Sequence, residues 1–226
     1  MNGSAVPPSF LRIMLLSPAV VGVASVDPLD VDLDVTTDVL GLPYIPRHRL
    51  AARLRDAADD VAAAFPDMIT ALRDLLGSSR RLTGTRMLQI GHGELPRSVQ
   101  AAAAHAVHSE AASTVDADLP RPMASRIRDA YTEILVSTAR DEDGAPIPGT
   151  FHQIRAIRAG TAFTAPLSLS FRGEHVSADH RRAVALMCVA FEQIGTGHSR
   201  GLGQIEASLD GDLDHTRDLA FGRSQK

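Results

Sequence analysis

The stretch Ile194-Gly-Thr-Gly-His-Ser-Arg-Gly-Leu-Gly-Gln-Ile205 decides the expected architecture, because it places a glycine-rich loop between a helix and a last strand. Two Gly-x-Gly pairs, Gly195/Gly197 and Gly201/Gly203, flank His198-Ser199-Arg200. The order helix, loop, strand is the reverse of a dinucleotide fingerprint, and a P-loop's Gly-Lys-Ser/Thr does not occur. Four glycines within this loop favour a backbone that approaches a ligand phosphate closely over a plain helix-to-strand turn.

Working outward from this loop, apolar periodicity predicts strands and helices over the rest of the chain. The expected strands cover 10–16, 85–95, 130–137, 151–157, 161–171 and 204–209, and the expected helices cover 50–61, 68–76, 98–115 and 180–194. Without insertions this order is β, α, β, β, α, β, which is typical of an α+β, ferredoxin-like (RRM-like) fold. We expect one domain over 1–226, with an inserted helical and loop segment at about 96–130, a thumb-like hairpin at about 137–153, and a flexible tail at 211–226.

Composition describes a globular chain of 226 residues, with 44% hydrophobic and 22% charged residues. The net charge of -4 gives no sign of the basic surface of a free-standing nucleic-acid binder. Lys226 is the only lysine among the 23 lysines and arginines, which reflects either phosphate recognition by arginine or a GC-rich genome. The single cysteine, Cys188, fits a cytoplasmic protein, and no apolar run reaches the ~18 residues that a membrane span requires.

Three further motifs accompany the glycine-rich loop, in a fixed order along the chain. Gly41-Leu-Pro-Tyr-Ile-Pro-Arg-His-Arg-Leu-Ala-Ala-Arg-Leu-Arg55 is similar to the G-L-P-Y-I-P-G-S-S-L-K-G-A-L-R of the RAMP superfamily of CRISPR-associated RNA-binding proteins. That family's later glycine motifs resemble Leu75-Leu-Gly77 with Leu88-Gln-Ile-Gly91, and Arg140 with Gly149-Thr150-Phe151 and Arg158-Ala-Gly-Thr-Ala-Phe163. Length and motif order resemble the backbone subunit of type III effectors.

The resemblance implies that the glycine-rich loop and the start of the first helix hold guide RNA, while the thumb reaches the guide-target duplex. Carried over to this sequence, the RNA-binding positions are Arg47, His48, Arg49, Arg53, Arg140, Gly195, Gly197, His198, Ser199, Arg200, Gly201 and Gly203. The family's G-S-S-L-K-G is replaced here by Arg47-His48-Arg49-Leu50-Ala51-Ala52. Phosphate binding is compatible with this change, because helix N-terminal N–H groups remain and the arginines supply charge.

The loop before Gly41 is rich in aspartate, and the subunits that cut target RNA carry an aspartate in this loop. The resemblance puts the cleaving position nearest Asp32, with Asp30 and Asp34 one register step away. A carboxylate there would position a divalent cation such as Mg²⁺ or assist the attack of the 2′-hydroxyl. Aspartate alternating with valine and leucine is equally typical of a strand with one polar face. A calcium loop is disfavoured because Val35 stands where its glycine would be, and no protein metal site is assigned.

The sequence therefore predicts a guide-RNA-binding backbone subunit of a cytoplasmic type III-like CRISPR effector in antiviral defence. Its expected partners are guide RNA, target RNA, other RAMP-type subunits and copies of itself, with no membrane. Two alternatives stay open: a guide-processing endoribonuclease with His48 as acid or base, and a structural subunit that cuts nothing.

Overall fold

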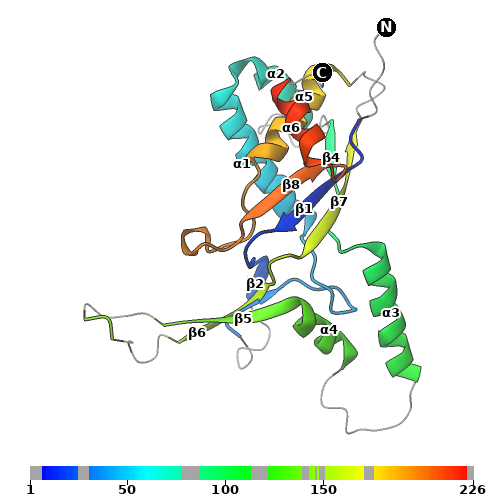
Figure 1. Cartoon of the computed structure of the whole chain (residues 1–226), viewed down its shortest axis with the longest axis vertical. Helices are drawn as coiled ribbons and strands as arrows, with labels where there is room; N and C mark the ends of the chain where they lie inside the picture. The colour runs from blue at the N-terminus through cyan, green and yellow to red at the C-terminus, as the bar shows by residue number, and fades with distance from the viewer. Residues whose placement is uncertain are drawn as a thin grey trace.

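An antiparallel sheet with the strand order β4-β7-β1-β8 forms the centre of the computed structural model. The structure describes residues 7–24, 31–77, 87–112, 122–138, 143–145, 147, 151–170 and 176–222. The helices that cover this sheet lie at the top of Figure 1. The elements of this half are β1 (Phe10–Leu15), α1 (Arg47–Ala64), η1 (Pro66–Met68), α2 (Ile69–Leu76), β4 (Leu88–Ile90), β7 (Ala162–Leu169), α5 (Ala178–Ala190), η2 (His198–Arg200), β8 (Ile205–Leu209) and α6 (Leu213–Phe221).

The order β1-α1-β4-β7-α5-β8 confirms the predicted βαββαβ core. Alternate residues of β1 are buried against the helices, and Ile13 lies between Phe163 of β7 and Ala207 of β8. On α1, buried Leu50 and Leu54 begin the apolar face that packs against α5. The core therefore lies between one face of the sheet and its helices.

A second sheet has the strand order β2-β3-β6-β5. Its strands are β2 (Gly22–Ala24), β3 (Leu33–Val35), β5 (Thr132–Ser137) and β6 (His152–Ile157). β3 runs parallel to β6, whereas β5 and β6 pair in an antiparallel way. These two strands are called the arm, and they extend to the left in Figure 1. Much of the predicted thumb, 137–153, lies outside the described residues; Ser137 ends β5 and His152 begins β6. The predicted insertion contains α3 (Arg97–Ala112) and α4 (Met123–Tyr131), which contact each other.

Several sequence expectations need correction. The expected strand 85–95 is described from residue 87 on, and there it is limited to β4. The expected strand 130–137 begins only at Thr132, because α4 continues to Tyr131. The aspartate-rich segment is not all loop, since its residues 33–35 form β3. Pairing with a strand more than a hundred residues away overrides the local turn signals in this segment.

The expectation of a flexible tail at 211–226 is wrong for residues 213–221, which form α6. The Asp212 side chain caps this helix by accepting a hydrogen bond from the His215 N–H at 2.8 Å. Thr216 and Ala220 are buried where α6 packs on α5 and β8. None of the helices in the described ranges has the length and apolar character needed to cross a membrane.

Candidate nucleic-acid interface

The glycine-rich loop between α5 and β8 has a backbone that only glycine adopts readily. Its four glycines have φ between 74° and 82°. At Gly203 a Cβ atom would lie 1.9 Å from the carbonyl oxygen of Ile194, and at Gly195 one would lie 2.4 Å from that of Val20. Gly201, by contrast, has nothing within 4 Å of a Cβ position. The loop is therefore closely packed at its two ends and open at its tip.

Hydrogen bonds hold both ends of this loop against the segment that follows β1. The Gly203 N–H donates to the Pro18 carbonyl at 2.8 Å, and the Thr196 N–H donates to the Val20 carbonyl at 3.2 Å. Between these anchors Ser199 and Arg200 are exposed. His198 Nε2 is buried and has no hydrogen-bond partner in the described part of the chain. The loop thus presents a fixed backbone with an exposed arginine, Arg200, at its tip.

The arginines at the start of α1 point in two directions. Arg49 and Arg53 are half-buried, and each donates one guanidinium hydrogen bond of 3.1 Å to a backbone carbonyl, that of Gly22 and of Gly195 respectively. Arg53 also forms an ion pair of 3.1 Å with Asp56. These two arginines therefore connect α1 to β2 and to the glycine-rich loop, a bracing role that the sequence did not reveal.

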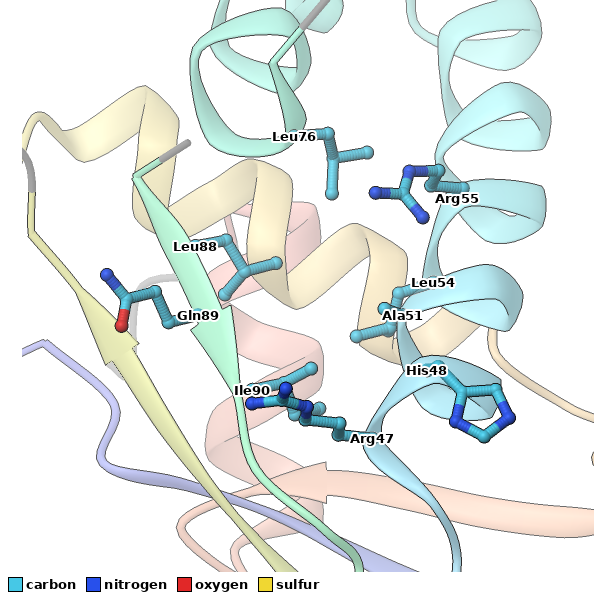
Figure 2. Close-up of a pocket in the computed structure, with 9 residues that line it drawn as sticks. All are labelled: Arg47, His48, Ala51, Leu54, Arg55, Leu76, Leu88, Gln89 and Ile90. Atoms are coloured by element: carbon cyan, nitrogen blue, oxygen red, sulfur yellow. The ribbon is translucent and has the colours of Figure 1, made fainter. Parts of the chain in front are cut away.

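Arg47 and His48 are exposed and line a cavity of about 550 Å³ between α1, α2 and β4. Figure 2 shows the Arg47 and Arg55 side chains extending from α1 toward this cavity. Its remaining walls are Ala51, Leu54, Leu76, Leu88, Gln89 and Ile90. Arg55 is absent from the predicted set, although its spacing of eight residues from Arg47 places both on one helix face. The Arg47 N–H already donates to His92 Nδ1 at 3.3 Å, so part of the helix N-terminus is occupied.

The candidate aspartates have different surroundings. Asp30 and Arg140 lie outside the described residues. Asp32 has an exposed side chain, and its Oδ2 accepts a hydrogen bond of 2.8 Å from the Gln153 N–H. The same oxygen lies 3.5 Å from His152 Nδ1. Asp32 is therefore open to solvent beside the end of the β5–β6 ladder.

Asp34 is part of an ion-pair network. Its Oδ1 lies 3.1 Å from Arg155 Nε, and its Oδ2 lies 3.7 Å from Arg128 Nη1. Asp129 accepts from both of these arginines at 3.1 Å. Arg155 is only 4% exposed, so this network joins β3, β6 and α4 at a largely buried position. Within the described ranges no three or more His, Cys, Asp or Glu side chains gather in a way that would hold a metal ion.

One short segment connects these features. Between β1 and β2, Ala19 pairs with Ile157 of β6, and Val20 pairs with Thr196 of the glycine-rich loop. Gly22 pairs with Val35 of β3 and accepts the Arg49 hydrogen bond. Figure 1 shows the glycine-rich loop and the arm projecting to the same side of the molecule. The glycine-rich loop and the strand β3 are thus joined through β2 and the segment that precedes it.

No protein-family model and no curated protein matches this sequence. Solved structures do match. A chain of the type III-B Cmr-beta complex bound to cognate target RNA superimposes with a TM-score of 0.63 and 11% identity over 96% of this chain and 100% of that one. A chain of Cmr-beta in its apo state gives 0.62 and 12%, over 93% and 100%. A chain of a type IV-B CRISPR complex gives 0.55 and 16%, over 93% and 98%. The chain therefore shares its fold with chains of type III-B and type IV-B CRISPR complexes.

Proposed function

We propose that this protein is a guide-RNA-binding backbone subunit of a cytoplasmic, type III-like CRISPR effector that acts in antiviral defence. Its partners would be guide RNA, target RNA, other RAMP-type subunits and further copies of the chain. The observation that carries the proposal is the glycine-rich loop, anchored at Gly203 and Thr196 and presenting Ser199 and Arg200 outward. The fold shared along nearly the whole chain with CRISPR complex chains supports it.

The recognition chemistry would be directed at the RNA backbone. Arg200 at the loop tip and Arg47 and Arg55 beside the cavity supply cations, whereas Arg49 and Arg53 hold the surfaces that carry them. Contacts of this kind position an RNA without reading its bases, so sequence specificity would come from guide-target pairing. An overall net charge of -4 does not conflict with this mode, because these arginines are gathered on a few surfaces.

The salt dependence of RNA binding tests this assignment. The wild-type protein and Arg200→Ala, Arg47→Ala and Arg55→Ala variants would be titrated with single-stranded guide RNA at several salt concentrations. The slope of log K against log salt is negative, and each lost phosphate contact should make it less steep by about 0.7. Arg217→Ala, which removes an exposed arginine from α6, is the matched control. Equal slopes in all variants, or no RNA bound by the wild type, would contradict the proposal.

We further propose that the subunit cleaves bound target RNA, with Asp32 as the catalytic residue. Asp32 is exposed beside His152, whereas Asp34 is engaged by two arginines. The assembled complex would be incubated with matched target RNA in wild-type, Asp32→Ala and Asp34→Ala forms. Loss of cleavage in Asp32→Ala, with the free energy of unfolding unchanged, supports this role. Asp34→Ala should instead lower the stability of the protein.

A further inference from the structure

His152 is the side chain that faces Asp32 across the junction of β3 and β6. Its Nδ1 lies 3.5 Å from Asp32 Oδ2, and the two side chains are 63% and 52% exposed. The contact is built into the backbone: the Asp32 N–H donates to the Gln153 carbonyl, and the Gln153 N–H donates to Asp32 Oδ2, both at 2.8 Å. Asp32 is therefore held in place beside His152, and both side chains are open to solvent where the β5–β6 ladder ends.

The partners of Asp32 and Asp34 differ in one chemical respect. Asp34 faces Arg155 and Arg128, and a guanidinium keeps its proton in proteins. Asp32 faces an imidazole, a side chain whose ring nitrogens can either donate or accept a proton. A fixed ion pair suits a structural joint, whereas a carboxylate beside an imidazole joins a proton acceptor to a group able to donate a proton.

We propose that His152 is a catalytic residue that acts with Asp32 in cutting RNA. This inference rests on the proposed cleavage at Asp32. The Asp32 carboxylate takes the proton of the 2′-hydroxyl, and the 2′-oxygen forms a bond to the adjacent phosphorus. The bond from phosphorus to the 5′-oxygen breaks, and the His152 imidazolium gives its proton to that oxygen. The products are a 2′,3′-cyclic phosphate and a 5′-hydroxyl end.

The contact between Asp32 and His152 also lets the two side chains exchange the proton that resets them for another cleavage. After one cleavage Asp32 carries the proton from the 2′-hydroxyl, and His152 lacks the proton that it gave away. Transfer of the proton from Asp32 Oδ2 to His152 Nδ1 returns both groups to their starting states without any further reactant. The step therefore balances in atoms and charge using only the RNA and these two side chains.

A modified target RNA separates this role from mere positioning. The assembled complex would be given matched target RNA with either an ordinary linkage or a 5′-bridging sulfur at the cleaved position, because a sulfur leaving group needs no proton. His152→Ala should slow cleavage of the ordinary linkage by about 10²-fold or more. On the sulfur substrate His152→Ala should cleave at close to the wild-type rate, while Asp32→Ala stays slow on both. His215→Ala, which changes an exposed histidine of α6, is the control and should behave as wild type.

Each outcome decides a different point. An equal loss on both substrates would overturn the acid role of His152 and leave it a positioning residue. Wild-type rates on both substrates would show that His152 takes no part in cleavage. Product ends other than a cyclic phosphate and a 5′-hydroxyl would overturn the proposed step. A wild-type complex that binds target RNA without cutting it would overturn cleavage while leaving the RNA-binding proposal intact. Absence of bound guide RNA would instead refute the RNA-binding proposal itself.

Discussion

Replacing Gly203 with alanine tests whether the glycine-rich loop depends on close backbone packing. Alanine at a φ of 74° costs about 1–2 kcal/mol in backbone strain alone. Its Cβ would also lie 1.9 Å from the Ile194 carbonyl oxygen, so the chain must move there. That movement disrupts two hydrogen bonds of 2.8 Å, from Ile194 N–H to Gly203 and from Gly203 N–H to Pro18, each worth about 1 kcal/mol. The expected loss of stability is about 3–4 kcal/mol.

Gly201→Ala is the matched control, because it has nearly the same φ and no atom within 4 Å of the new Cβ. It should lose only the strain energy of about 1–2 kcal/mol. Urea denaturation of both variants, at constant m-value, measures the difference. Equal losses in the two variants would refute the view that the packed ends of the loop, and not backbone conformation alone, require glycine.

Further expectations concern other parts of the chain. Arg155→Ala removes the buried cation between Asp34 and Asp129 and should lower the free energy of unfolding by about 3 kcal/mol, measured in urea; a loss below about 0.5 kcal/mol would show that the network has no structural role. Burial raises the pKa of Cys188 from 9.0 to about 12, so the folded protein should resist thiol reagents at pH 8 and react only when unfolded. Because the pKa of Cys188 is higher in the folded protein than in the unfolded chain, the contribution of this thiol to the free energy of unfolding is full below pH 9 and declines as the pH rises toward 12. This decline should be missing in Cys188→Ala. Asp210→Ala removes the acceptor for three hydrogen bonds from residues 9 and 10 and should cost about 1–2 kcal/mol, whereas an unchanged melting temperature would contradict this.

The ferredoxin-like core was predictable because its signals are local. Three local signals each determine one element: the apolar period of α1, the apolar run of β1, and Ser177, whose side chain caps α5 by accepting a hydrogen bond from the His180 N–H. In the second sheet, β5 and β6 were predicted as strands, but β2, β3 and the pairing of β3 with β6 were not. This pairing joins β3 to β6 across more than a hundred residues, and β3 has only three residues, too few for a clear alternation.

In the candidate site, too, features formed by residues close in sequence were predictable, whereas contacts between distant segments were not. The four glycines of the loop were recognisable as a group because they are close in sequence. The division of the α1 arginines between bracing and exposed positions depends on where Gly22 and Gly195 carbonyls lie, which spacing along one helix does not reveal. The neighbourhood of Asp32 and His152 likewise exists only through the pairing of β3 with β6.

The strand orders of the two sheets have a consequence for the sequence of folding events. Within the described ranges, β1 pairs with β7 and β8 and β4 pairs with β7, so no ladder of the first sheet exists before residue 162 has been synthesised. The second sheet has all its strands once residue 157 has been made, because β6 ends at Ile157. Chain entropy slows the pairing of strands that are distant in sequence. The nascent protein can therefore complete the second sheet first, whereas the first sheet stays open until β8 at 205–209 has been made, which makes an N-terminal fragment of this chain a poor substitute for the whole.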